Sequence, residues 1–445
     1  MSNFFQDSKV EWLGNIPNHW FVTKLKNQCQ IIPSNVDKKS HDNEIEVALC
    51  NYVDVYYNDF ITDSLNFMIA TANEHELQKF QLIEEDVILT KDSEDPYDIA
   101  VPALVVSTQP KLLCGYHLSI IRSNNQNFNG SYLFWVLRDR SIASQLHRQA
   151  TGITRWAIAI KHVKNCSIPF PPISEQKIIS AYLDKTCAAI DKAIEAKQKQ
   201  LEILDALRKS IIHKAVTRGL DDSVELKDSG VEWLGRIPKH WNCKHLKRVC
   251  SKIQTGNTPP TANIEYYIDG TIPWYAPGCY DGGIYLQKPA KEINEVAYFN
   301  NKLRMFPANS IFIIGIGATI GKVAMTRVEA SCNQQIIALV CNSNVYAKYL
   351  AYHLKIFETI IPRIAQFTTL PIMDQNKIGY LQIVVPPIKE QRKITNFLDN
   401  KIVINNRLEN NLVNQISTLN QYRKSLIHEC VTGKRRINED LSSSK

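Results

Sequence analysis

Apolar residues recur along two segments of this chain with the spacing of long amphipathic helices. Each segment follows a Pro-Pro pair, at 171–172 or 386–387, and contains no proline or glycine until Gly219 or Gly433. Proline bars a helix before it and glycine commonly ends one, so we predict helices over 173–219 and 388–433. The apolar positions at heptad spacing are Leu183, Cys187, Ile190, Ile194, Leu201, Leu204 and Ile211 in the first segment and Leu398, Ile402, Leu412, Ile416, Leu419 and Leu426 in the second.

Polar residues interrupt both apolar stripes. Lys197 and Arg208 interrupt the first, and Asn405 and Glu409 replace apolar residues in the second. A helix with so narrow a stripe is unstable alone, so the two helices are expected to pack on each other. Because each helix leads back to a globular segment, we expect an antiparallel coiled coil about 60–65 Å long at about 1.5 Å per residue. Two separate surface helices on unrelated domains are the alternative.

The segments before these helices, about 22–168 and 242–383, alternate short apolar runs with turn-forming residues. Runs typical of strands are 86–90, 103–106, 310–314 and 336–340. Clusters of Gly, Asn and Pro, such as 254–260, separate them, and short helices are expected at 131–148 and 347–363. The fold class is therefore α+β, with two mixed, strand-rich globular domains.

The sequence also contains an internal repeat. Residues 7–20 and 228–241 are identical at 11 of 14 positions, PPISEQ at 171–176 returns as PPIKEQ at 386–391, and RKSIIHKAVTRG at 208–219 returns as RKSLIHECVTGK at 423–434. A period above 200 residues means two copies of a whole domain, hence a pseudo-two-fold internal repeat. We predict a first domain at 1–172, a first long helix at 173–219, a second domain at 220–387, a second long helix at 388–433 and a flexible tail at 434–445.

Composition narrows the class of protein only a little. The net charge of +8 suits a nucleic-acid partner but is common among other proteins. The N-terminus lacks the features of a signal peptide, and the most apolar run, 311–316, is far too short to span a bilayer, so we expect a cytoplasmic protein without a membrane partner. Eleven cysteines without a Cys-x-x-Cys pair argue against a disulfide scaffold or a zinc ribbon.

Motifs that suggest catalysis are incomplete. Residues 312–317 resemble the glycine box of methyltransferases but contain one residue too many, and Asp95-Pro96-Tyr97 lacks the second proline of a base-modifying motif. Residues 317–323 are too short for a phosphate loop, and no Ser or Thr follows Lys322. We therefore expect no catalytic residues, no metal and no cofactor in this chain.

Residues suited to reading DNA gather on turn-rich segments of both halves. Arg, Lys, Asn and Gln can hydrogen-bond to base edges, and aromatic rings can stack or wedge. The tyrosines of 51–57 are predicted to form an aromatic strand. A surface or packing role is an equally good interpretation of each candidate. The candidates are Tyr52, Tyr56, Lys91, Arg155, Trp156 and Lys161 in the first half and Gly256, Asn257, Thr258, Trp274, Lys322, Asn333, Gln334, Thr368 and Thr369 in the second.

The repeated Trp-Leu-Gly-x-Ile-Pro-x-His-Trp boxes, the Pro-Pro-x-x-Glu-Gln starts and the Arg-Lys-Ser-x-Ile-His helix ends resemble those of type I restriction–modification specificity subunits. The resemblance implies two target-recognition domains that each read half of a split double-stranded DNA site. It also implies that the N-terminal box packs near the end of the second long helix. The first half departs from the family pattern, because Thr90-Lys91-Asp92-Ser93 replaces the glycine loop of the second half.

The same resemblance implies a non-catalytic subunit and names its partners. Two modification subunits would methylate adenine and restriction subunits would translocate and cut, so the methyl donor, ATP and magnesium are expected on those partners. The alternative function is a duplicated coiled-coil scaffold that binds protein partners without sequence-specific DNA readout. That alternative predicts DNA binding that is insensitive to sequence and only weakly dependent on salt.

Overall fold

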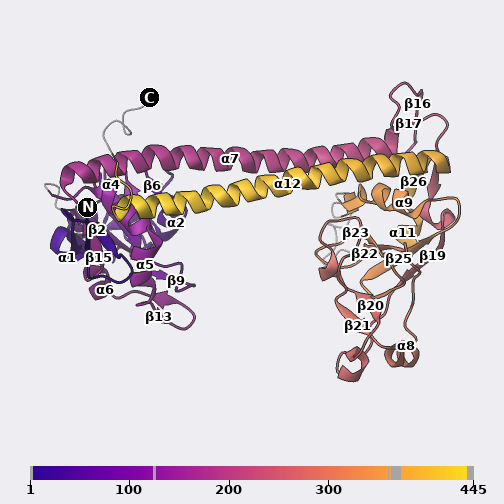
Figure 1. Cartoon of the computed structure of the whole chain (residues 1–445), viewed down its shortest axis with the longest axis horizontal. Coiled ribbons are helices and arrows are strands. Elements are labelled where there is room, and N and C mark those ends of the chain that lie inside the picture. Colours follow the sequence, from indigo (N-terminus) through magenta and orange to yellow (C-terminus); the bar gives the residue numbers. More distant parts are fainter. Residues whose placement is uncertain (1–3, 124–126, 359, 362–371, 438–445) are drawn as a thin grey trace. The chain divides into compact units, whose positions relative to one another are not determined.

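The computed structural model describes residues 4–123, 127–358, 360–361 and 372–437 (Figure 1). The chain forms two compact units, Met1–Gln198 with Asn414–Lys445 and Lys199–Val413. Each unit therefore contains one globular domain and part of each long helix. Of the predicted tail at 434–445, the last eight residues lie outside the described residues.

Two facing sheets build the first unit. The larger sheet has the strand order β4-β12-β8-β10-β6 and the smaller one the order β11-β5-β7. The buried residues of β8 alternate between two cores, as expected for a strand covered on both faces. Ile88 packs toward the smaller sheet, and Val87 and Leu89 pack toward the helices on the other face. The strands are β4 (Cys29–Pro33), β5 (Ile45–Cys50), β6 (Phe60–Ile61), β7 (Met68–Ala72), β8 (Val87–Thr90), β10 (Pro102–Val105), β11 (Leu112–Cys114) and β12 (Leu118–Ser123).

Short helices and strand pairs complete the first unit. A three-stranded ribbon, β13-β14-β9, and the pairs β1-β2 and β3-β15 lie outside the two main sheets. The helices are α1 (Leu25–Gln28), α2 (Tyr52–Tyr56), α3 (Glu74–Phe80), α4 (Gly130–Arg138), α5 (Arg140–His147) and α6 (Ile160–Lys164), and the strands are β1 (Phe5–Asp7), β2 (Asn15–Pro17), β3 (Phe21–Lys24), β9 (Asp92–Ser93), β13 (Thr151–Gly152), β14 (Trp156–Ala157) and β15 (Ser167–Phe170).

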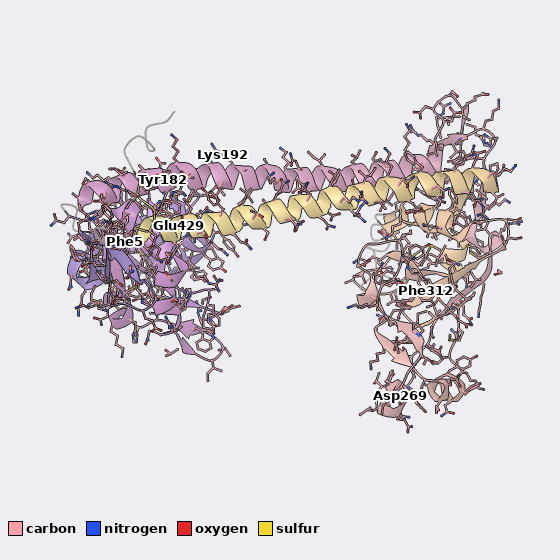
Figure 2. All side chains as sticks on the ribbon, viewed as in Figure 1. Phe5, Tyr182, Lys192, Asp269, Phe312 and Glu429 are labelled. Atoms are coloured by element: carbon pink, nitrogen blue, oxygen red, sulfur yellow. The ribbon has the colours of Figure 1, made fainter. Side chains whose placement is uncertain are left out.

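The second unit repeats the arrangement. Its larger sheet has the order β19-β25-β22-β23 and its smaller one the order β21-β20-β24. Within β22, Ile311 and Ile313 face one core and Phe312 and Ile314 face another, and Phe312 lies inside the unit (Figure 2). The strands are β19 (Cys250–Thr255), β20 (Ile272–Tyr275), β21 (Lys291–Ile293), β22 (Ile311–Ile314), β23 (Val323–Met325), β24 (Ser331–Cys332) and β25 (Ile336–Cys341).

Two strand pairs of the second unit also have counterparts in the first. The pairs β16-β17 and β18-β26 match β1-β2 and β3-β15. The strands of these pairs are β16 (Leu226–Asp228), β17 (Arg236–Pro238), β18 (Asn242–His245) and β26 (Gln382–Val385). The unit also contains the helices α8 (Glu295–Asn301), α9 (Ala347–Leu354) and α11 (Gln375–Tyr380) and the short 3-10 helices η1 (Leu246–Arg248), η2 (Ile264–Tyr267) and η3 (Pro277–Cys279).

The two long helices are α7 (Ile173–Arg218) and α12 (Ile388–Val431). In the first unit Asp191 of α7 contacts Arg423 of α12, and Lys197 of α7 contacts Gln415 of α12. The partners on α12 descend in number as those on α7 ascend, so the helices run antiparallel there. Arg208 and Glu409 interrupt the two apolar stripes. In the second unit Nη1 of Arg208 lies 3.9 Å from Oε2 of Glu409. Of the predicted packing positions, Leu183, Ile190, Leu398 and Leu426 are buried, and Ile194, Leu201, Leu204, Ile211, Ile402, Leu412, Ile416 and Leu419 are half-buried.

The N-terminal box packs on the end of α12 within the first unit. Trp20 shares a core with Leu426 and Val431, and a Cβ added to Gly433 would lie 2.4 Å from Cδ of Pro17. The predicted α+β fold class with its internal repeat is confirmed.

Two local predictions were wrong. Residues 51–57 do not form a strand, because Asn51 and Asp54 cap the helix α2 between them. The single helix expected at 131–148 is two helices, because Asp139 has an extended backbone and its carboxylate caps α5 through the N–H groups of Ser141 and Ile142.

Candidate functional site

In both units one residue at the end of the larger sheet is hydrogen-bonded through its main chain to two other loops. We call this arrangement the main-chain junction. In the first unit the N–H of Lys91 donates to the carbonyl of His117 at 2.9 Å, and the N–H of Ile158 donates to the carbonyl of Lys91 at 2.9 Å. In the second unit Gly315 takes the place of Lys91, with Gln335 and Met373 as its partners at 2.8 Å each. This junction places loops from distant parts of the sequence beside one another.

In the first unit a carboxylate organises the site. Oδ1 of Asp92 accepts from Nη2 of Arg155 at 2.6 Å, and Oδ2 lies 2.6 Å from Nδ1 of His117. The hydrogen bond with Asp92 raises the pKa of Arg155, whose side chain is 56 % exposed. The ion pair with Asp92 therefore fixes the orientation of the Arg155 guanidinium, which remains accessible to solvent.

Two candidate tyrosines lie next to this cluster on α2. The rings of Tyr52 and Tyr56 stack with centroids 5.4 Å apart. The hydroxyl of Tyr56 donates to Asp98, and this bond raises the pKa of Tyr56 to about 12. Burial raises the pKa of Tyr52, which also interacts with Ser93 of β9. Both hydroxyls are thus protonated donors at neutral pH.

A hairpin contributes Arg155 and Trp156 to the same cluster. Strand β14 pairs with β13 and with β9, so that Trp156 lies opposite Ser93. Gly152 lets the hairpin close tightly, because an added Cβ would lie 2.0 Å from the carbonyl oxygen of Arg155. Ile153, in the turn, is 93 % exposed. The hairpin presents an apolar tip and a cation together.

The two lysines predicted for the first half are placed differently. Lys91 is half-buried, its Nζ donates to the carbonyl of Ser34 at 2.9 Å, and burial lowers its pKa. It therefore supports the loop from inside. Lys161 lies exposed on α6, which packs on α1 and β4 rather than on the tyrosine-bearing helix.

In the second unit a glycine turn replaces the carboxylate cluster. A Cβ on Gly256 would lie 1.9 Å from the carbonyl oxygen of Cys332, so only glycine fits there. Asn257 fixes the turn, since its Oδ1 accepts from the N–H of Arg304 at 2.9 Å. Nη1 of Arg304 in turn donates to the carbonyl of Thr255 at 2.7 Å.

Amide side chains line this turn. The hydroxyl of Thr258 donates to Oε1 of Gln334, and Nδ2 of Asn333 donates to Oε1 of Gln335 at 3.0 Å. Gln334 is exposed, while Asn333 is buried and shapes the loop. Lys322 is exposed at the end of the neighbouring glycine loop, where its carbonyl accepts from the N–H of Ile314.

One further candidate of the second half, Trp274, does not offer a free surface. Trp274 is 7 % exposed, packs with Ile293 and Ala297, and donates from Nε1 to the carbonyl of Asn257 at 3.1 Å. It stabilises the turn from beneath. Thr368 and Thr369 lie outside the described residues.

Sequence reasoning missed several residues of these clusters. In the first unit they are Asp92, Asp98 and His117, and in the second it is Arg304. One signal was present, because the faint match of 114–118 to 332–336 places His117 opposite Gln335 in the repeat. The carboxylates gave no such signal, because they have no acidic counterpart in the second half.

Neither cluster gathers the side chains that a metal ion needs among the described residues. No group of three or more His, Cys, Asp or Glu side chains that could hold a metal ion occurs among the described residues. Amides, a guanidinium, hydroxyls and aromatic rings are instead the groups that recognise base edges and phosphates. Within the same part of the chain, no helix is long and apolar enough to cross a membrane.

Comparison with known proteins agrees with this chemistry. The model of the type I restriction modification DNA specificity domain matches residues 17–207 and 238–418. The chain is 22 % identical over 440 residues to the protein described as the type I restriction enzyme MjaX specificity subunit of Methanocaldococcus jannaschii, and the match covers 97 % of each. It is 29 % identical over 204 residues to the EcoR124I/EcoR124II specificity subunit of Escherichia coli, covering 44 % of this chain and 47 % of that one.

Solved structures share the fold. One from a study of complex assembly and conformational transition of the type I R-M system superimposes with a TM-score of 0.72 at 16 % identity, covering 94 % of this chain and 99 % of that one. The HsdS subunit of Thermoanaerobacter tengcongensis superimposes with a TM-score of 0.53 at 18 % identity, covering 94 % and 98 %.

Proposed function

This chain belongs to the family of type I restriction–modification DNA specificity subunits, and we propose that it reads a split DNA target through the two loop clusters. Each unit would recognise one half of a bipartite double-stranded site. Partner subunits would then methylate adenine or cleave the DNA at the direction of this chain. The chain itself would take no part in the bond-making steps.

One observation carries this proposal. The junctions at Lys91 and at Gly315 have the same main-chain hydrogen bonds, yet different side chains surround them. The first cluster offers Arg155, tyrosines and a carboxylate, and the second offers Gln334 and Lys322. A common frame with different donors and acceptors is what two readers of different base sequences require, since base edges are distinguished by their donor and acceptor pattern.

The assembly partners follow from the long helices. In the second unit several large apolar side chains of α7 and α12 are about half exposed. Apolar helix faces of this kind are typical of protein–protein interfaces. We infer that the two modification subunits dock on the helices, with restriction subunits joining afterwards. The exposed residues are Ile203, Leu207, Val403, Ile404, Leu408 and Val413.

The division of chemistry between the subunits is part of the same proposal. The methyl donor, ATP and magnesium would bind to the partners, and this chain would supply only specificity. On the same proposal the chain would work in the cytoplasm, where it can reach the host genome.

The test is to map methylated adenine across the host genome with and without this gene. The expected result is a split motif with a fixed unread gap that is methylated only when the gene is present. Unchanged methylation, together with DNA binding by the purified chain that is insensitive to sequence, would favour the protein scaffold instead.

A further inference from the structure

Two cysteines of the second unit lie opposite each other on neighbouring strands. Cys250 is the first residue of β19 and Cys341 is the last residue of β25, and the antiparallel register pairs them directly. Both side chains border the same core, because Cys341 follows Ile337 and Leu339 onto one face of the strand and Cys250 packs on the same group of residues. The two thiols therefore point to the same side of the larger sheet.

The backbone holds this pair at close range. The N–H of Asn342 donates to the carbonyl of Val249 at 2.9 Å, so the ladder hydrogen bond joins the residues next to the pair. Cys250 and Cys341 thus form a non-hydrogen-bonded pair, in which Cα atoms are about 4.5 Å apart and side chains lie closest. A disulfide joins residues whose Cα atoms are about 4.4–6.8 Å apart, so the strands keep the two thiols at a separation that such a bond can span.

The two thiols also differ in how readily they lose a proton. A hydrogen bond with Cys250, together with burial, raises the pKa of Cys341. Cys341 therefore keeps its proton at neutral pH, and Cys250 is the thiol placed to react first. Lys247, Arg248 and Lys252 are exposed within three residues of Cys250. A cationic surrounding of this kind is typical of cysteines that react with oxidants.

Access to solvent distinguishes this pair from another pair of facing thiols. Cys250 and Cys341 are both half-buried. Cys50 and Cys114 also lie opposite each other, on β5 and β11 of the first unit, but both are fully buried. A dissolved oxidant can therefore reach the pair in the second unit without unfolding of the sheet.

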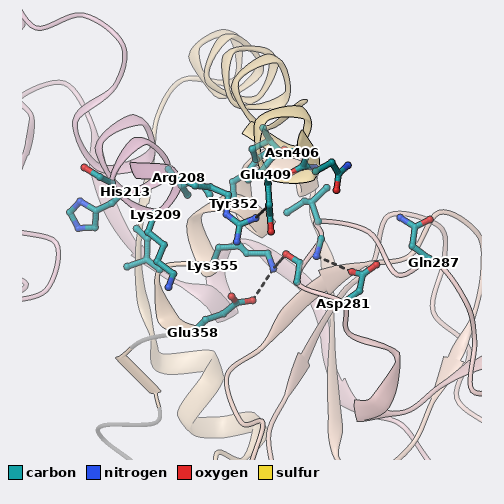
Figure 3. A pocket seen from close by; sticks show the side chains of 18 residues that line it. Arg208, Lys209, His213, Asp281, Gln287, Tyr352, Lys355, Glu358, Asn406 and Glu409 are labelled. Atoms are coloured by element: carbon teal, nitrogen blue, oxygen red, sulfur yellow. Dashed lines mark hydrogen bonds and ion pairs between the residues drawn. The ribbon is translucent and has the colours of Figure 1, made fainter. Parts of the chain in front are cut away.

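The surroundings of the pair suit a small oxidant. Neither thiol lines the cavity of about 680 Å³ in the second unit (Figure 3), so that cavity cannot present an organic ligand to them. The register shifts between Cys250 and Lys252, which marks a β-bulge beside the pair. Since a bulge interrupts the ladder locally, the end of β19 can adjust when a bond forms there.

The first unit carries the same pair with one thiol replaced. Its strands β4 and β12 take the places of β19 and β25 in the larger sheet, and their register pairs Cys29 with Ser123. Cys29 lies 221 residues before Cys250, which is the spacing of the repeated box. A hydroxyl in place of the second thiol prevents a disulfide in this copy, so the two units differ in their response to oxidation.

We propose that Cys250 and Cys341 form a reversible disulfide when the protein meets a peroxide. The sulfur of Cys250 attacks one oxygen of hydrogen peroxide, which gives a sulfenic acid on Cys250 and, with the proton of that thiol, one water. The sulfur of Cys341 then attacks the sulfur of Cys250, and the sulfenic hydroxyl leaves with the proton of Cys341 as a second water. Two thiols are thus oxidised to one disulfide, and one peroxide is reduced to two waters.

The bond would act on the recognition part of the second unit. It closes a loop from residue 250 to residue 341, which contains the turn at Gly256 and the exposed side chains of Lys322 and Gln334. Closing a long loop restricts the unfolded chain and so stabilises the folded one. Oxidation would therefore make the second unit more resistant to unfolding and leave the first unit as it is. This chemistry does not depend on which DNA sequence, if any, the chain reads.

The test treats the full-length chain with hydrogen peroxide and maps its peptides without reduction. The expected product is a pair of peptides joined through Cys250 and Cys341, which disappears after treatment with a dithiol reductant. The matched control is Cys279→Ser, which removes another half-buried thiol of the second unit and should leave the product unchanged. Cys250 and Cys341 that stay unlinked after oxidation, whether unreacted or oxidised separately, would overturn the proposal.

A second variant tests the order of the two steps. Cys341→Ser gives the second unit the thiol and hydroxyl that Cys29 and Ser123 form in the first. The sulfenic acid on Cys250 then has no thiol to attack it, so a 1,3-diketone that traps sulfenic acids should label Cys250 more strongly than in the parent chain. In Cys250→Ser, residue 341 should remain unlabelled. Labelling of Cys341 in that variant would reject Cys250 as the first thiol to react.

The effect on folding is measured separately. Urea unfolding followed by circular dichroism should move to higher urea after oxidation of the parent chain and return after reduction. The same treatment should not move the transition of Cys341→Ser. An equal shift in both chains would show that the disulfide does not stabilise the second unit.

Discussion

The indole Nε1 of Trp20 donates a 2.9 Å hydrogen bond to Oε2 of Glu175 at the start of α7, 155 residues away in the chain. Trp241 and Glu390 repeat this bond at 2.9 Å in the second unit. In both copies the neighbouring histidine, His19 or His240, holds the other carboxylate oxygen. The repeated box therefore anchors the first turn of each long helix to its own domain.

We predict that Trp20→Phe lowers the free energy of unfolding of the first unit by about 1–3 kcal/mol. The indole is buried, so its loss removes a donor from a partly buried carboxylate and leaves a small void. Urea denaturation followed by circular dichroism measures the effect. Trp12→Phe is the control, because Trp12 packs on the same core and its indole forms no hydrogen bond within the described part of the chain. Equal losses in both variants would contradict a role for the hydrogen bond.

A buried histidine predicts acid sensitivity in the second unit. His353 is fully buried, and burial lowers its pKa from 6.5 to about 3. The unfolded chain binds a proton below pH 6.5 and the folded chain does not, so stability falls as the pH drops from 6.5 toward 3. The loss approaches about 1.4 kcal/mol for each pH unit in that window.

The measurement is the urea midpoint at pH 7.5 and pH 5.5 for the parent chain and for His353→Val. Valine is the natural replacement, because Val136 occupies the equivalent position in α4 of the first unit. We expect the urea midpoint to differ less between pH 7.5 and pH 5.5 in His353→Val than in the parent chain. In His41→Val, which replaces an exposed histidine, the difference in midpoint should be the same as in the parent chain. The same pH dependence in all three chains would show that other groups cause it.

Long helices could be predicted from this sequence because their signals are local. The absence of proline and glycine over 173–218 and the heptad spacing of Leu183 and Ile190 need no tertiary information. Helix α2 could not be predicted from its aromatic residues, because the capping side chains Asn51 and Asp54 outweigh the strand preference of tyrosine.

The candidate site was harder to predict because distant segments build it. Arg155, Tyr52 and Asp92 come from three parts of the first domain. The pairing of β9 with β14 brings Arg155 to Asp92, and Tyr52 of α2 reaches the same place through Ser93. Burial also depends on the whole fold. Trp274 resembles an exposed stacking residue in sequence, yet it lies in a core beneath the glycine turn. The alignment of the two copies, in contrast, could be predicted from the sequence, because Cys114 matches Cys332.

The glycine turn of the second unit predicts a selective loss of function. Gly256→Ala forces the turn away from Cys332, because its Cβ would lie 1.9 Å from that carbonyl oxygen. We expect affinity for the full DNA target to fall at least tenfold while the melting temperature of the first unit stays unchanged. Gly278→Ala is the control, since nothing lies within 4 Å of its added Cβ. Full DNA affinity in Gly256→Ala would remove this turn from the recognition surface.

The hairpin of the first unit predicts a change in specificity. Arg155→Ala should relax selectivity at one base position and cost about 1–3 kcal/mol if its guanidinium contacts a base, as a bidentate contact to guanine would. A competition assay over a library of randomised half-sites measures this. Arg148→Ala is the control, because Arg148 bonds only to Ser144 of its own helix among the described residues. A uniform loss over all sequences, with a salt slope reduced by about one, would assign Arg155 to a phosphate.

The length of the long helices predicts the gap between the two halves of the DNA target. Four residues inserted into α7 after Gln198, and four into α12 after Val413, add about 6 Å of helix and about one full turn. Since base pairs repeat about every 3.4 Å, the unread gap should grow by about two base pairs while both half-site sequences stay the same. Mapping of methylated adenine in a host that carries the lengthened gene measures the gap directly. The control inserts four residues after Asp222, in the loop that follows α7, where the gap should not change. An unchanged gap in the lengthened chain would show that the helices do not set the spacing.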